Sequence, residues 1–278
     1  MAKRASNEHA TVSGPIRIGI GGWDFAPWRG VFYPPGLKKK DELAYACARL
    51  SAIEINATFY RTQSPATFAA WTSGAPDGFV FAVKAPRGAT YTSDNDRAGA
   101  AIQHFLGSGL DELGDRLGPI LWQLAPTRKF DADALEGFLR ELPQKLGDRK
   151  LQHAIEARHQ SFAHAEAAAI LRAHGAARVI VDSDAHEMTG DVTADFVYLR
   201  LQRTKEAVET GYDAGALDLW ANRLKTYAAG AVPDDMPRAA PDVHMPKVSR
   251  PVYAFVISGA KVRAPAAAMA LIARLQEK

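Results

Sequence analysis

Short apolar stretches alternate with helix-like segments eight times along this chain, and that count limits the fold more than any other feature of the sequence. A strand followed by a helix, repeated eight times, is the pattern of a (β/α)8 barrel. An open, doubly wound sheet is the alternative, and the count of eight favours the barrel. The predicted strands span residues 16–21, 52–56, 79–84, 119–124, 151–156, 178–182, 196–201 and 252–257.

The predicted helices follow all but one of these strands. Three carry local signals: Ser64 and Asp131 are expected N-caps, and Gly175 follows the last turn of its helix, where glycine commonly ends a helix. The sixth strand has a weak helix or none after it. The helices are expected at residues 40–50, 65–73, 96–106, 132–142, 163–174, 216–229 and 265–276.

The length of 278 residues fits one barrel domain, which takes about 250 residues. We expect the barrel to span residues 15–278, after a loose polar tail at residues 1–14 that has no apolar core of a signal peptide. Residues 231–251 contain five prolines and cannot form a long helix. They form either a meandering insertion before the eighth strand or a flap beside the site.

The composition is that of an ordinary soluble globular protein, with 47% hydrophobic and 23% charged residues. The net charge of +3 is too small to indicate nucleic-acid binding by itself. Cys47 is the single cysteine, so no internal disulfide can form, and a reducing, cytoplasmic setting fits. No apolar run is long enough to span a membrane. The oligomeric state is not indicated.

Charged side chains recur near the carboxyl ends of the predicted strands. Side chains alternate between the two faces of a strand, so the residues opposite the large apolar ones should point into the barrel. The active sites of barrel enzymes lie at this end. The inward ionic residues are expected to be Glu54, Lys84, Glu156, Arg158, Asp182 and Arg200, with Asn56 and Gln123 beside them.

Glu54 and Glu156 come from different sides of the expected barrel mouth, and paired carboxylates can serve as general acid and base. The structural alternative is that each only holds an arginine or a lysine. Lys84, Arg87, Arg158 and Arg200 could bind a phosphate or a carboxylate.

Two further kinds of chemistry remain open at this mouth. A Schiff-base role for Lys84 requires desolvation, which nearby carboxylates would oppose. A metal site could use Glu54, Glu156, Asp182 and His159, although their spacing is no recognised ligand motif and neighbouring cations oppose it. We therefore assign no metal ligands and no cofactor.

Aromatic residues cluster at the predicted mouth. Trp23, Phe59 and Tyr60 could stack on a sugar or a base, or could simply pack over the barrel. Together with Arg61 and Arg87, these aromatic residues could form a stacking platform for nucleic acid, which is the alternative.

The chain resembles the domain-of-unknown-function family 72, the YecE-like proteins. The segments 18–23 (Ile-Gly-Ile-Gly-Gly-Trp) and 32–34 (Phe-Tyr-Pro) resemble the opening signature of that family, and 54–60 (Glu-Ile-Asn-Ala-Thr-Phe-Tyr) resembles its Glu-Ile-Asn-Ser-Thr-Phe-Tyr signature. The remaining matches are at residues 79–87, 118–126, 156–159 and 198–201. The resemblance implies a TIM-type barrel and no established activity.

The chain departs from this family pattern at two places. Gln202 stands where a histidine is common, and residues 257–259 (Ile-Ser-Gly) replace an Asn-Asn or Asn-Asp pair. Chemistry that needs those groups is therefore not expected here.

The sequence leads to two functional hypotheses. The first is an enzyme that uses acid/base chemistry on a small phosphorylated or carboxylated metabolite, as a hydrolase, lyase or isomerase. The second is a non-catalytic binding protein, with nucleic acid as one candidate ligand. A closed pocket would favour the enzyme, and a positive stripe would favour nucleic acid.

Overall fold

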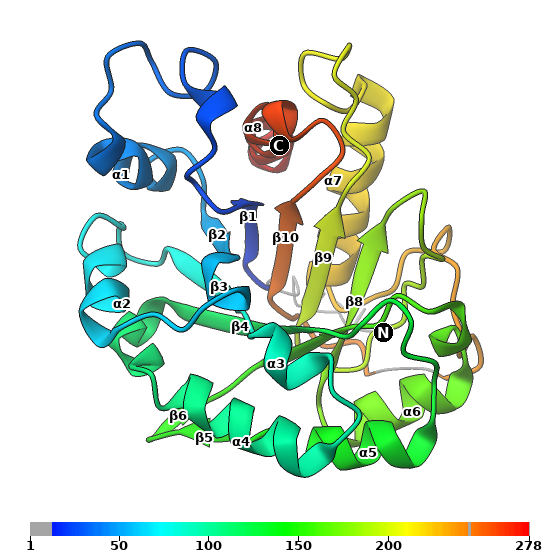
Figure 1. The fold of residues 1–278 in the computed structure, drawn as a ribbon. Helices are drawn as coiled ribbons and strands as arrows, with labels where there is room; N and C mark the ends of the chain where they lie inside the picture. The colour runs from blue at the N-terminus through cyan, green and yellow to red at the C-terminus, as the bar shows by residue number, and fades with distance from the viewer. Residues whose placement is uncertain (1–12, 244–245, 278) are drawn as a thin grey trace, which may run out of the picture.

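The computed structural model describes residues 13–243 and 246–277. Eight parallel strands close into a barrel, in the order β1-β10-β9-β8-β7-β4-β3-β2, as the sequence predicts (Figure 1). The strands are β1 (Ile16–Gly21), β2 (Ala52–Ile55), β3 (Val80–Lys84), β4 (Leu117–Gln123), β7 (His153–Glu156), β8 (Ala177–Asp182), β9 (Val197–Leu201) and β10 (Val252–Val256).

Helices connect most of the strands and pack around the barrel. Ser64 and Asp131 accept hydrogen bonds from the backbone N–H groups of Thr67 and Ala134, so both predicted N-caps are confirmed. No helix follows β8, which agrees with the weak signal there. The longer helices are α1 (Glu42–Cys47), α2 (Pro65–Thr72), α4 (Asn95–Leu106), α5 (Ala132–Arg140), α6 (Ala165–Ala173), α7 (Ala214–Ala228) and α8 (Ala264–Gln276).

Several smaller elements were not predicted from the sequence. A short helix, α3 (Arg87–Thr90), follows β3, and a 3-10 segment at Leu110–Arg116 precedes β4. A two-stranded hairpin, β5 (Lys145–Leu146) and β6 (Arg149–Lys150), precedes β7. These elements are too short to give a clear periodic signal.

The apolar core has two parts, one inside the barrel and one between the barrel and its helices. The inner part combines small residues such as Ala52, Ala82 and Ala154 with the rings of Tyr198 and Phe255. The small side chains make room for the large ones, so the barrel interior is filled. The outer part contains the large residues that alternate with them, Ile53, Phe81 and Trp122 among others.

The predicted orientation of β8 is wrong. Val179 and Val181 belong to the inner apolar cluster, whereas Ile180 packs in the outer core. Asp182 shares the outward parity of Ile180 and accepts a 2.8 Å hydrogen bond from the hydroxyl of Tyr212. The prediction assumed that valines face the helices, but here they fill the barrel interior.

The Pro-rich segment, residues 231–251, contains no helix or strand in its described part. Gly190 donates a hydrogen bond to the carbonyl of Pro237, and Asp191 accepts hydrogen bonds from Ala239 and Ala240. The segment runs from the end of α7 to the start of β10 and lies at the amino-terminal end of the strands (Figure 1). This position favours the meandering insertion over a flap at the mouth.

The predicted tail, residues 1–14, lies outside the described residues except for its last two positions. Among the residues that the structure describes, no helix is both long and apolar enough to cross a lipid bilayer.

Candidate functional site

Arg200, on strand β9, joins the two glutamates that the sequence singled out. Its Nε and Nη2 donate to Glu54 at 3.1 and 3.0 Å, and its Nη1 donates to Glu156 at 2.5 Å. Both glutamates are fully buried, and Arg200 is only 2% exposed. Burial alone would lower the pKa of Arg200, but the two carboxylates outweigh burial and raise it. The guanidinium therefore stays charged.

Tyr198, Arg158 and Gln123 complete this hydrogen-bond network. Tyr198 donates to Glu54 at 2.7 Å, and the Nε of Arg158 donates to Glu156 at 2.6 Å. The Oε1 of Gln123 accepts from Arg158 at 3.0 Å and from Arg200 at 3.3 Å. The inward orientations predicted for Gln123, Arg158 and Arg200 are thus confirmed.

All four carboxylate oxygens of Glu54 and Glu156 already accept hydrogen bonds. Burial would raise the pKa of Glu156, but the guanidinium groups of Arg200 and Arg158 outweigh it and lower that pKa. A general acid needs a raised pKa and access to substrate. The acid/base role of these glutamates remains a prediction from the sequence, and the network favours the structural alternative.

Lys84 ends strand β3 and is 8% exposed. Its Nζ lies 3.8 Å from the centre of the Phe59 ring, a cation–π contact. Among the described residues, no carboxylate lies within ion-pair distance of this amine. Burial lowers the pKa of Lys84 to about 8, with help from Arg200, although Glu54 and Glu156 oppose the shift. Burial has a larger effect on the pKa of Lys84 than the two carboxylates have. The sequence did not indicate this result.

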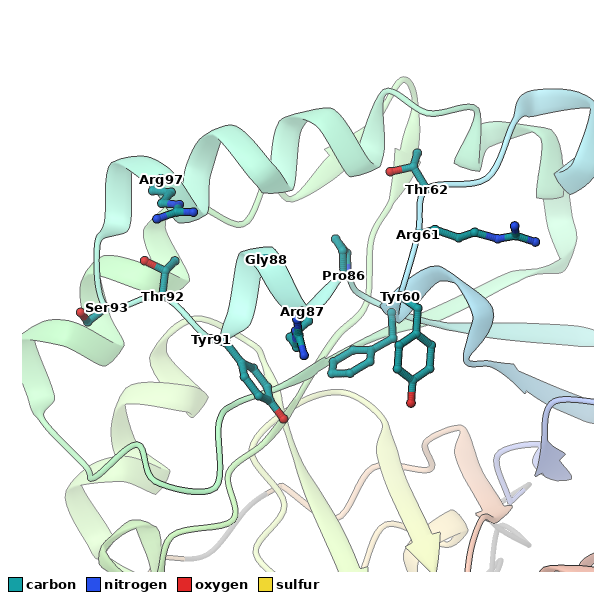
Figure 2. A pocket seen from close by; sticks show the side chains of 11 residues that line it. Tyr60, Arg61, Thr62, Pro86, Arg87, Gly88, Tyr91, Thr92, Ser93 and Arg97 are labelled. Atoms are coloured by element: carbon teal, nitrogen blue, oxygen red, sulfur yellow. The ribbon is translucent and has the colours of Figure 1, made fainter.

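An open cleft of approximately 660 Å³ lies beside Lys84, at the carboxyl ends of β2 and β3. Figure 2 shows Arg87 between Tyr60 and Tyr91 in this cleft, while Arg61 points away from them. None of the described residues that line the cleft is acidic. Its lining is Phe59, Tyr60, Arg61, Thr62, Pro86, Arg87, Gly88, Tyr91, Thr92, Ser93 and Arg97.

The three arginines of the cleft are exposed, and within the described chain their guanidinium groups make no ion pair or hydrogen bond. Tyr60 and Tyr91 are 81% and 42% exposed. Asp94 and Asp96 are the acidic residues next to the lining residues along the chain, and the carboxylate of Asp94 caps α4 by accepting a 3.1 Å hydrogen bond from the backbone of Arg97. The cleft is therefore positively charged and has two accessible aromatic rings.

The other predicted site residues have structural contacts. Asn56 donates to the backbone carbonyl of Glu54 at 3.2 Å, which holds the end of β2. Trp23 is half-buried and packs edge-on against Trp71, with 5.3 Å between ring centres. His159 accepts from the backbone of Ser161 at 3.2 Å and so caps a 3-10 turn.

Asp182 lies on the outer face of β8, so the metal set of Glu54, Glu156, Asp182 and His159 is not brought together. In the described part of the chain, no three histidine, cysteine or acidic residues are grouped as metal ligands. Asp182 also contacts Arg203, at 3.4 Å. Its predicted place in the inward cluster is therefore wrong.

Sequence reasoning missed Tyr91 and Arg97 in the cleft and did not include Tyr198 in the site. Tyr198 stands two positions before Arg200 on the same strand, and this shared parity was the available signal. Tyr91 and Arg97 follow the third strand, in the kind of loop that builds barrel sites, but no residue pattern marks them.

The closed parallel barrel, with its charged network at the carboxyl ends of the strands, defines a TIM-type (β/α)8 protein. Residues 17–278 match the family described as protein of unknown function DUF72, and the chain belongs to that family. The YecE-like resemblance found in the sequence agrees with this assignment.

Two solved structures of the same family have similar folds. A DUF72 family protein from Thermotoga maritima MSB8 is 23% identical, with a TM-score of 0.73 over 95% of this chain and 100% of the other. A DUF72 family protein from Enterococcus faecalis V583 is 14% identical, with a TM-score of 0.68 over 95% of this chain and 96% of the other. At these identities, the likeness concerns the fold. No curated protein matches the sequence significantly.

Proposed function

We propose that this protein binds a phosphorylated ligand with a planar ring, of nucleotide size, in the cleft between the loops after β2 and β3. The observation that carries the proposal is that three exposed arginines, whose guanidinium groups have no partner among the described residues, line the same cleft as Tyr60 and Tyr91. An arginine fork binds phosphate oxygens in pairs, and a tyrosine ring offers a face for stacking. Ligand pockets commonly have volumes of about 300–1,000 Å³, a range that includes this cleft.

The charges of the inner network are already paired with one another. Two of its arginine side chains are already held by Glu54 and Glu156. Arg87, by contrast, begins the short helix α3 and has an exposed side chain. The charge available to an external anion is therefore found at the rim of the barrel and not at its centre.

The test is a calorimetric titration of the full chain with adenosine 5′-monophosphate, adenosine and inorganic phosphate. The monophosphate should bind more tightly than either part alone, because it uses both the arginines and the rings. Arg87→Ala should weaken its binding about tenfold or more, the value of a charge-assisted hydrogen bond. Arg140→Ala is the matched control, because Arg140 is exposed on α5 and its guanidinium pairs with Glu136 alone among the described residues. Equal affinities for the two variants would overturn the proposal.

Single-stranded nucleic acid is the second candidate, favoured by the 81% exposure of Tyr60 and by the openness of the cleft. A short oligonucleotide should then bind more tightly than the mononucleotide, with an affinity that falls steeply as salt rises. Equal affinities for the mononucleotide and the oligonucleotide would leave the mononucleotide as the ligand class.

A further inference from the structure

Lys84 is a buried amine that the charged network leaves without a carboxylate partner. Buried lysines are normally paired, because an unpaired buried charge is costly. Here the Nζ atom rests 3.8 Å from the centre of the Phe59 ring, and the described residues offer it no ion pair. The residue is 8% exposed, so a small part of it still contacts solvent.

The two nearest sources of negative charge are held by other groups. Arg200 and Tyr198 bind Glu54, and Arg158 and Arg200 bind Glu156. The two glutamates form one group of charges with Lys84, Arg158 and Arg200. When the amine of Lys84 is protonated, this group contains three cations and two anions. Losing its proton would balance these charges, in agreement with a pKa that burial lowers to about 8.

Phe59 connects the amine to the open cleft. Its ring carries the cation–π contact with Lys84, and the same residue lines the cleft. A small molecule in the cleft can therefore contact the ring that covers the amine, and a slight movement of that ring would open the amine, which does not itself line the cleft, to the cleft. A structural lysine would be held by an ion pair, and the described residues provide none for Lys84.

We propose that Lys84 is a nucleophilic lysine that condenses with a small aldehyde or ketone. The unprotonated Nζ attacks the carbonyl carbon, the carbonyl oxygen takes up the proton that the nitrogen releases, and a carbinolamine forms. The carbinolamine then loses its hydroxyl group with a proton as water and leaves an imine between Nζ and the carbonyl carbon. No oxidant, reductant or cofactor is needed, and hydrolysis of the imine reverses the step.

The test treats the full chain with glycolaldehyde and cyanoborohydride, which reduces the imine to a stable amine, and locates the label by peptide mass spectrometry. At pH 7, Lys84 should be labelled about ten times faster than Lys145, because its lower pKa gives a much larger fraction of free amine. Lys145 is the internal control, since it is exposed on the β5–β6 hairpin. Both lysines are compared in the same sample, so no variant has to fold.

The pH dependence gives a second readout. Labelling of Lys84 should level off just above pH 8, whereas labelling of Lys145 should continue to rise towards pH 10. Lys84→Arg should lose this label and keep the others. Labelling of Lys84 that is slower than or equal to that of Lys145, or that rises with the same pH profile, would overturn the proposal. The result is independent of nucleotide binding, because glycolaldehyde carries no phosphate.

Discussion

The hydroxyl of Tyr198 donates a 2.7 Å hydrogen bond to Glu54 across the barrel, between two residues that are 144 positions apart in the sequence. Burial, and the charge of Glu54 in addition, raise the pKa of Tyr198 well above its usual value, so this tyrosine stays a donor. The bond connects β9 to β2, which are not neighbours in the barrel. It therefore joins two strands across the barrel interior and helps to hold the carboxylate of Glu54 in place.

Tyr198→Phe should lower the free energy of unfolding by about 1–2 kcal/mol, because it removes one of the hydrogen bonds to a buried carboxylate. Chemical denaturation measures the change. Tyr60→Phe is the control: the residue is 81% exposed and should change stability by less than about 0.5 kcal/mol. Equal effects of the two substitutions would show that the bond from Tyr198 contributes nothing.

Arg200→Met should lower the free energy of unfolding by about 3–5 kcal/mol, since it leaves two buried carboxylates without their shared partner. Arg140→Met, which removes an exposed ion pair with Glu136, should cost about 1 kcal/mol or less. Denaturant unfolding of both variants gives the comparison. A loss for Arg200→Met as small as that of the control would contradict a structural role for the network.

The pKa of Glu156 is lowered in the folded protein, so its pairing stabilises the fold above the unfolded-state pKa of about 4.3 and is lost as pH falls below it. The difference in unfolding free energy between wild type and Glu156→Gln should therefore be constant from pH 7 to pH 6 and should shrink towards pH 3. Denaturation at a series of pH values measures it. A difference that does not change with pH would mean that Glu156 is not an ionised partner.

Lys84→Met should stabilise the protein at pH 7, by about 1–3 kcal/mol, because the wild type keeps a buried charge there. The folded-state pKa of about 8 lies below the unfolded-state value, so wild-type stability should rise between pH 8 and pH 10.5. The advantage of the variant should shrink over the same range. Thermal unfolding at pH 7 and pH 10 tests the sign, and a destabilised variant at pH 7 would contradict the unpaired state of Lys84.

The barrel and most of its inward charges could be predicted because strand parity is a strict geometric rule. Ile53 and Ile55 fixed the outward face of β2, and Glu54 then had to point inward. The same rule failed for Asp182, because valines can fill a barrel interior as well as face a helix. Parity separates Val179 and Val181 from Ile180 and Asp182, but it does not say which of the two faces of β8 points inward.

The cleft could be predicted only in part. Phe59, Tyr60, Arg61 and Arg87 follow predicted strands directly, whereas Arg97 belongs to the first turn of α4, ten residues further along. Its approach to the cleft depends on the path of residues 91–94, which carry no periodic pattern. The low pKa of Lys84 could not be predicted either, because its main cause is the burial of the amine, which depends on how the folded chain packs around it.

A crystal structure of the protein with adenosine 5′-monophosphate tests the central claim most directly. The account predicts phosphate oxygens at about 2.7–3.2 Å from the guanidinium of Arg87, with the adenine ring against Tyr60 or Tyr91. Nucleotide density found only at a site remote from Tyr60, Arg87 and Tyr91, or no density at saturating concentration, would contradict it.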